Sequence, residues 1–166
     1  MLRDSVQRAE IGANEKERKA AYLLAGQLLI SEEPCQVTTI LGSCVAACVW
    51  DPGLGIGGLT HFLLPAGPAL SASSPKFGNV AVVTLVEGLV RFGSRAERLV
   101  AKVFGGACVL EPMRGRSRHL GMQNVEIAMR LLGELGIPVL AQDVGGDRGR
   151  KLIFHTDTGG SWIRRL

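Results

Sequence analysis

Two side chains that can share covalent chemistry stand close together in this chain. Cys44 closes the run Leu-Gly-Ser-Cys, and His61 follows it seventeen residues later. A thiol with a general base in reach can attack a carbonyl carbon and form an acyl intermediate that neither residue would support alone. The pair therefore predicts nucleophilic hydrolysis of an acyl group, provided that the fold brings the two side chains together.

The residues between Cys44 and His61 predict a β-hairpin. Residues 45–50 and 55–64 are mostly apolar and partly β-branched, and Pro52-Gly53 between them is typical of a turn. A two-residue loop at Pro52-Gly53 places Cys44 directly opposite His61, with Cβ atoms about 5 Å apart on one face of the sheet. A shift of one residue would place them on opposite faces, so the interpretation depends on the turn.

Length and composition set the class of protein. The chain has 166 residues, of which 46% are hydrophobic and 20% charged, enough for one compact domain with a substantial core. We expect a mixed-charge tail at residues 1–20 and a domain at residues 21–166. The start has no uninterrupted apolar core of a signal peptide, and Gly, Pro or charge interrupts every later apolar run. We therefore expect a soluble, cytoplasmic protein without membrane insertion.

The other cysteines and histidines are interpreted as structural. In a reducing compartment all four cysteines are expected to be free thiols. Cys44 and Cys48 are four residues apart, but no second close pair of Cys or His follows, so neither a metal site nor a cofactor is expected. His119 in a basic loop and His155 at a strand end have no cysteine at a comparable spacing.

The periodicity of the chain predicts strands with two helices inserted. Val82, Leu85 and Leu89 recur at helical spacing within residues 79–92, with Asn79 as a candidate cap, and a second helix carries Val125 and ends near Gly136. Besides the hairpin, strands are expected at residues 37–41, 99–104, 138–144, 151–155 and 161–165. The fold class predicted is α/β, a single domain with mostly antiparallel or mixed β-sheet layers and two main helices.

Several of these segments resemble one known family. The strings are Thr38-Thr39-Ile40-Leu41-Gly42-Ser43-Cys44, Asp51-Pro52, Gly57 to Pro65, Ala101 to Ala107, Gly121 with Asn124, Asp143 to Gly146 and Gly149-Arg150-Lys151. In this order they resemble the CheD family of chemoreceptor glutamine deamidases, over roughly Tyr22 to the C-terminus. So long an ordered match is far more specific than one short motif.

The resemblance implies a function and a set of site residues. Members hydrolyse particular glutamine side-chain amides on the cytoplasmic helices of chemotaxis receptors to glutamate, with release of ammonia. Cys44 corresponds to their nucleophile, His61 to their base and Thr38 to the threonine that completes the triad. Family members also bind the phosphatase CheC, so an adaptor role is implied as a further possibility.

The chemistry sets its own requirements. A free thiol is mostly protonated at neutral pH, so His61 is expected to form a thiolate–imidazolium pair with Cys44. Gly42 and Ser43 let the backbone approach the substrate, and an amide at or near Cys44 is the expected oxyanion donor. Six residues of straight strand span about 20 Å, so the chain must turn at Gly42 before the Thr38 hydroxyl or carbonyl can hold a ring nitrogen of His61.

Two other functions stay open. The fold can serve as a non-catalytic adaptor for receptors or CheC, with Cys44 and His61 serving structure only. Nucleic-acid binding has little support, because Lys and Arg exceed Asp and Glu only by 19 to 15 and 5% of residues are aromatic. Arg114, Arg116 and Arg118 are interpreted as a solvated loop, or alternatively as a group that steers acidic receptor helices.

Overall fold

The computed structural model describes residues 17–68, 73–114 and 118–166. The predicted tail at residues 1–20 lies almost wholly outside this range, although the first strand already begins at Lys19. The elements are β1 (Lys19–Tyr22), β2 (Leu28–Ser31), β3 (Cys35–Leu41), β4 (Val45–Asp51), β5 (Ile56–Thr60), α1 (Gly78–Arg91), the 3-10 turn η2 (Ala96–Arg98), β6 (Val100–Gly105), the 3-10 turn η3 (Glu111–Met113), α2 (Leu120–Glu134), β7 (Val139–Val144), β8 (Arg150–His155) and β9 (Ser161–Arg165).

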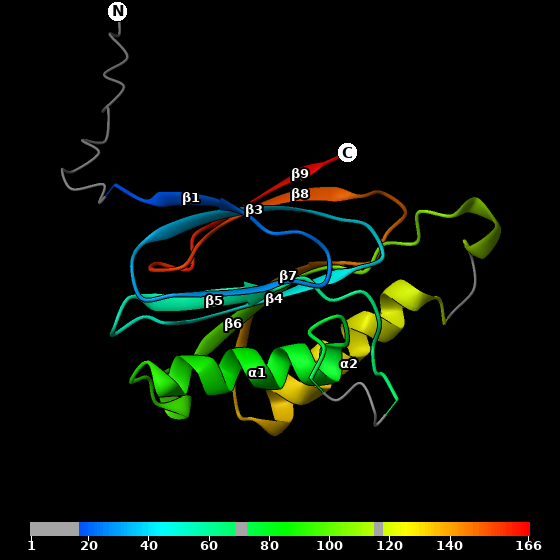
Figure 1. The fold of residues 1–166 in the computed structure, drawn as a ribbon. Coiled ribbons are helices and arrows are strands. Elements are labelled where there is room, and N and C mark those ends of the chain that lie inside the picture. The colour runs from blue at the N-terminus through cyan, green and yellow to red at the C-terminus, as the bar shows by residue number, and fades with distance from the viewer. Residues whose placement is uncertain (1–16, 69–72, 115–117) are drawn as a thin grey trace, which may run out of the picture.

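The strands form two stacked sheets, and both helices cover one side of the stack (Figure 1). One sheet has the strand order β1-β3-β8-β9 and the other the order β2-β5-β4-β6-β7. The pairs β1–β3 and β6–β7 are parallel and the remaining pairs antiparallel. The predicted α/β domain with mixed sheet layers and two main helices is confirmed.

The five-stranded sheet is the middle layer, so its strand β4 is buried on both faces. Val45, Ala47 and Val49 pack toward the helices, whereas Ala46 and Cys48 pack toward the four-stranded sheet. Two hydrophobic cores result, one on each side of the middle sheet. A strand between two cores reads as a continuous apolar run rather than an alternating one.

The helices form where their apolar spacing predicts them. In α1, Val82, Leu85 and Leu89 are buried in the helix-side core. The cap differs from the prediction, because Asn79 lies inside the first turn and Phe77 occupies the cap position without a side-chain hydrogen bond. The helix begins at Gly78, one residue before the predicted range, and there the backbone lies so close to Phe62 that a Cβ would be only 2.7 Å from that ring.

The β4–β5 hairpin exists, but its register differs from the prediction by two residues. Asp51 pairs with Ile56 and Val45 with Phe62, so paired residue numbers sum to 107 instead of 105. The loop has four residues, Pro52–Gly55, because Asp51 Oδ1 accepts hydrogen bonds from the amides of the second and third of them. Gly55 closes the loop with a φ of 67°, a conformation that glycine adopts without cost.

A two-residue shift keeps every side chain on its predicted face. Cys44 and His61 therefore still share the face that looks toward the four-stranded sheet. They are no longer directly opposite, because His61 faces Ala46 and Cys44 faces Leu63 in the extension of the observed register. They are diagonal neighbours, a relation with a Cα separation of about 7–8 Å in a regular sheet.

Candidate active site

The candidate site lies where the β4–β5 hairpin opens. Val45 and Phe62 form the last backbone pair, with reciprocal hydrogen bonds of 3.1 Å, and Cys44 and His61 flank this pair. The chain reaches Cys44 from β3 of the other sheet through a bend at Gly42 and Ser43. The turn predicted at Gly42 is therefore present, and it carries the chain from one sheet to the other.

His61 is buried and its ring is held from the neighbouring sheet. His61 is only 4% exposed, and its Nδ1 lies 2.8 Å from the Oγ1 of Thr39. The Thr39 hydroxyl donates its single proton to the Leu23 carbonyl at 2.7 Å. Toward the imidazole Thr39 can then only accept, so Nδ1 carries a proton and Nε2 is left with the lone pair. This is the tautomer that a general base at Nε2 requires.

The hydroxyl on the imidazole is that of Thr39 and not that of Thr38. Side chains alternate along β3, and Val37, Thr39 and Leu41 are buried toward the middle sheet. Thr38 faces the other way, in a cross-strand row with Ile153 of β8. Its carbonyl accepts the Leu23 amide at 2.9 Å. We expected Thr38 to hold a ring nitrogen of His61, but in the structure its neighbour Thr39 does so. The two side chains lie on opposite faces of β3.

Burial shapes the titration of both partners. Desolvation raises the pKa of the Cys44 thiol above its usual value, while the residue's own backbone N–H partly offsets this by favouring the thiolate. Desolvation likewise lowers the pKa of His61, against a smaller opposite effect of the Leu23 carbonyl. Both directions favour a neutral thiol beside a neutral imidazole at rest. These directions do not favour the predicted thiolate–imidazolium pair at rest, which stays a prediction.

The segment that carries Cys44 is fixed from β6. The Gly106 amide donates to the Cys44 carbonyl at 2.8 Å, and the Ala107 amide donates to the Gly42 carbonyl at 2.9 Å. Gly105, with a φ of 110°, allows this approach, since a Cβ there would lie 2.2 Å from the Cys44 carbonyl oxygen. The backbone on both sides of the sulfur is therefore held in place before any substrate arrives.

An apolar cavity of ≈ 410 Å³ adjoins Ser43. Its wall continues along the chain from Ala107 to Leu110 and reaches the start of α2. Val109 and Leu110 are exposed although both are apolar. Exposed apolar side chains next to the segment that carries Cys44 mark a surface that another molecule can cover.

The other cysteines and histidines of the sequence are buried or contact neighbouring groups of the fold. All four cysteines are free thiols, and Cys48 is fully buried, which raises its pKa strongly. His119 caps α2 through Nδ1, and the ring of His155 lies 4.6 Å from that of Trp162. Within the described residues, no three His, Cys, Asp or Glu side chains gather as metal ligands would.

The basic loop is only partly described. Arg114 lies 3.6 Å from Glu111, and Arg118 lies 3.9 Å from Glu126. Arg116 falls outside the described residues. Two of the three arginines are thus near carboxylates of their own chain, and exposed pairs of this kind contribute little to stability.

Comparison with known proteins identifies the family. A family model described as CheD chemotactic sensory transduction matches residues 63–165, more than half of the sequence. The chain belongs to the CheD family. A protein of Anaeromyxobacter dehalogenans named probable chemoreceptor glutamine deamidase CheD 1 is 54% identical over 149 residues, covering 90% of this chain and 86% of that protein.

A second CheD relative and one solved structure complete the comparison. The probable chemoreceptor glutamine deamidase CheD of Trichlorobacter lovleyi is 44% identical over 138 residues, covering 83% of this chain and 85% of that protein. The crystal structure of the Bacillus licheniformis hypothetical protein YfiH aligns with a TM-score of 0.47 and 17% identity, over 69% of this chain and 49% of that one. In the part of this CheD-family chain that is described, no helix has the length and apolarity to cross a membrane.

Sequence reasoning missed Thr39 although a signal for it was present. Val37, Thr39 and Leu41 have the period of two that marks the buried face of a strand, whereas Thr38 is out of phase with them. The Leu23 carbonyl carries no signal of this kind, because backbone groups leave no trace in residue type. The alternation of buried residues along β3 identifies the hydroxyl that contacts His61 better than the distance in sequence from Cys44 does.

Proposed function

We propose that this protein hydrolyses glutamine side-chain amides on chemoreceptors to glutamate and ammonia, with Cys44 as nucleophile and His61 as base. The observation that carries the proposal is the Thr39–His61 hydrogen bond, which leaves Nε2 unprotonated on the face that His61 shares with Cys44. Membership of the CheD family, whose relatives are named probable chemoreceptor glutamine deamidases, supports the choice of substrate.

The reaction begins from the neutral pair. His61 Nε2 takes the thiol proton as the sulfur of Cys44 attacks the amide carbon, forming the C–S bond and a tetrahedral oxyanion. The imidazolium then protonates the departing nitrogen, so the C–N bond breaks and ammonia leaves with a thioester behind. A water gives a proton to Nε2 as its oxygen attacks the thioester carbon. The C–S bond then breaks, the imidazolium returns the proton to the sulfur of Cys44, and the side chain is released as glutamate.

Three groups around Cys44 and His61 support the charged states of this sequence. The backbone N–H of Cys44 favours negative charge at its own sulfur, against the effect of burial on the pKa of the thiol. We propose this amide, carried by the bend at Gly42 and Ser43, as the oxyanion donor. Thr39 and the Leu23 carbonyl stabilise the imidazolium without a carboxylate, which predicts slower turnover than in triads that contain Asp.

The surface beside Cys44 supports a protein substrate in preference to free glutamine. Free glutamine carries an ammonium and a carboxylate, and both would require polar partners. The cavity next to Ser43 instead has walls of Val109, Leu110 and Met113. We propose that these apolar groups contact apolar side chains beside the target glutamine on a receptor helix.

The test uses a purified cytoplasmic fragment of a chemoreceptor. Each converted glutamine adds about 1 Da to the fragment, and hydrolysis releases one ammonia per conversion. We expect both signals with the wild-type protein and with Cys48→Ala, and neither with Cys44→Ala. Conversion by Cys44→Ala at the wild-type rate would refute the proposed nucleophile. Binding of the fragment without any conversion by the wild type would favour the non-catalytic adaptor instead.

A further inference from the structure

Asn124 joins the two chain segments that carry the candidate catalytic residues. It belongs to α2, is fully buried and donates both amide hydrogens of its side chain. One goes to the Ser43 carbonyl at 3.0 Å and the other to the Leu63 carbonyl at 2.9 Å. Ser43 precedes Cys44 directly, and Leu63 follows His61 by two residues. A single carboxamide therefore spans the open end of the hairpin.

The hydrogen bonds of Asn124 replace a missing step of the strand ladder. In an antiparallel pair, reciprocally bonded residues alternate, so Ser43 and Leu64 would form the next such pair after Val45 and Phe62. The Leu64 amide instead donates to the Lys76 carbonyl at 3.1 Å. Asn124 supplies the donor that the Ser43 carbonyl would otherwise lack. The strands thus separate at the site and are held at a fixed spacing from a third element.

The oxygen of the same side chain has no partner. Asn124 Oδ1 is buried and accepts no hydrogen bond in the structure. An unsatisfied buried polar atom costs about 1–3 kcal/mol. Packing alone gives no reason for a carboxamide here, since its oxygen is a liability and only its two donors are used. The residue type is explained by the two carbonyls that it holds.

We propose that Asn124 is a positioning residue that sets the separation of Cys44 and His61 by clamping the Ser43 and Leu63 carbonyls. The inference rests on the proposed function, because it assigns Asn124 a role in that reaction. Asn124 acts on the geometry from which the His61 imidazole takes the thiol proton. Displacement of a catalytic group by about 1 Å can lower a rate about 100-fold, so a clamp at this point acts on turnover more than on binding.

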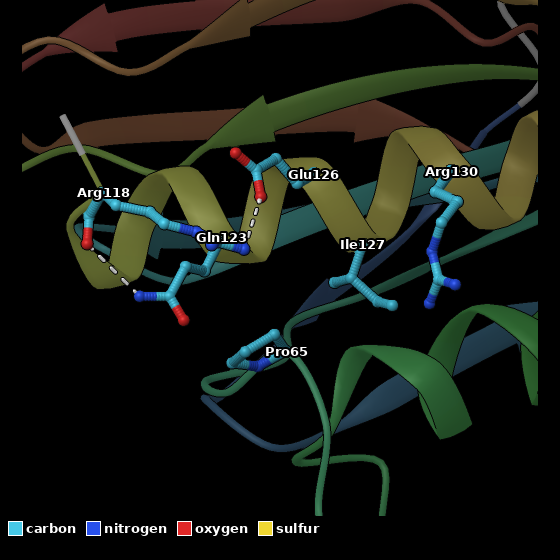
Figure 2. Close-up of a pocket in the computed structure, with 6 residues that line it drawn as sticks. All are labelled: Pro65, Arg118, Gln123, Glu126, Ile127 and Arg130. Carbon is cyan, nitrogen blue, oxygen red and sulfur yellow. Dashed lines mark hydrogen bonds and ion pairs between the residues drawn. The ribbon is translucent and has the colours of Figure 1, made fainter.

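The test removes the clamp in two variants, of which one keeps the side-chain volume unchanged. Asn124→Asp removes both donors and places carboxylate oxygens against two carbonyl oxygens, and Asn124→Ser removes the bridge with a smaller side chain. Gln123→Glu is the matched control, because Gln123 directly precedes Asn124 in α2 and its side chain points outward, where its Nε2 donates to the Arg118 carbonyl at 3.3 Å (Figure 2). It lines a surface pocket with Glu126 and Arg130 on the exposed side of the helix.

Two readouts separate positioning from stability. On a receptor fragment, we expect both Asn124 variants to lower kcat about 10- to 100-fold and to change KM less than about threefold. With iodoacetamide, we expect Cys44 to be alkylated more slowly near neutral pH than in the wild type, because the imidazole no longer lies where it can take the thiol proton as the sulfur attacks. Both are measured well below each variant's melting temperature. Gln123→Glu should match the wild type in both.

The alkylation profile needs no receptor, so it stands apart from the proposed function. A folded Asn124→Asp or Asn124→Ser protein with the wild-type kcat and the wild-type alkylation profile would overturn the positioning role. Failure of both variants to fold would assign Asn124 to stability alone and would overturn it equally. Retained deamidation in Cys44→Ala would instead refute the proposed function, whatever the Asn124 variants do.

Discussion

The two ends of the β4–β5 hairpin are held in different ways. At the closed end, Asp51 organises the loop with its own neighbours, accepting from the amides of Gly53 at 2.8 Å and Leu54 at 3.1 Å. At the open end, Cys44 and His61 depend on groups from other elements, namely Thr39 of β3 and Asn124 of α2. The loop at the closed end is therefore shaped by local hydrogen bonds, whereas the position of His61 at the open end depends on a contact from another sheet and that of Ser43 on a contact from a helix.

Under the proposed function, the closed end of the hairpin contributes stability and the open end contributes the chemistry. Asp51 is fully buried. Its Oδ2 also accepts a hydrogen bond from the Ser94 hydroxyl and lies 3.3 Å from Nε of Arg98. Burial alone would raise its pKa, but the Ser94 hydroxyl, the loop amides and Arg98 together hold the pKa below its usual value. At the open end the strands part and leave a half-buried thiol accessible. A reactive pair needs such an opening, which a fully bonded turn does not offer.

The largest effect is expected from the base at the open end. His61→Asn removes the proton acceptor for the thiol and the donor for ammonia, and we expect deamidation of a receptor fragment to fall about 100- to 10,000-fold. His155→Asn is the control, since that histidine lies at the far end of β8 beside Trp162. Equal deamidation rates in the two variants would show that His61 is not the base of the reaction.

A smaller effect is expected from the hydroxyl that orients the base. Thr39→Val keeps the shape but loses the contact to Nδ1, so both imidazole tautomers become accessible and we expect kcat to fall about tenfold. Thr38→Val should change kcat less than about twofold, because its side chain lies on the opposite face of β3. The reverse order of the two effects would restore the assignment to Thr38 that the family resemblance implies.

These two threonines show what the sequence can and cannot predict. The strands, both helices and the shared face of Cys44 and His61 follow from local periodicity, which survives even a two-residue error in register. The predicted register is wrong because the loop extends to Gly55. The hydrogen bonds of the Asp51 side chain determine this length, and the Pro-Gly pair does not. The contacts of Thr39 with His61 and of Asn124 with Ser43 join residues 22 and 81 positions apart, and no local pattern encodes such pairings.

The pH dependence gives a finer test of the open end. His61 must be neutral to accept the thiol proton, and burial lowers its pKa below the usual 6.5. Activity should therefore rise with pH through an acid limb below 6.5 and stay level across neutral pH. Because burial raises the pKa of Cys44 above 9.0, the alkaline decline should begin above that value. An acid limb above pH 7 in kcat/KM would contradict the neutral resting pair.

The smallest effect on activity is expected at the closed end. Asp51→Ala should lower the free energy of unfolding by about 2–4 kcal/mol, because it leaves buried donors without their acceptor. Deamidation per folded molecule should stay within about twofold of the wild type, as the loop lies at the far end of the hairpin from His61. Chemical denaturation measures the first and the receptor assay the second.

The same variant has a signature in acid. Since the folded pKa of Asp51 lies below its unfolded value, its charge contributes stability above pH 3.8, and this contribution is lost as the pH falls through the folded pKa. Asp51→Ala should therefore lose less stability on acidification than the wild type does. Asp147→Ala, at an exposed carboxylate, should retain the wild-type acid profile. A large loss of activity in folded Asp51→Ala would mean that the two ends are coupled.

The central claim is that the thiol at the open end carries the reaction, and titration of that thiol tests it most directly. The wild-type protein is treated with substoichiometric iodoacetamide, the modified fraction of each cysteine is mapped by peptide mass, and residual deamidation of a receptor fragment is measured on the same samples. Lost activity is predicted to equal the fraction of Cys44 alkylated, while buried Cys48 stays unmodified. Full deamidation by protein whose Cys44 is completely alkylated would contradict the account.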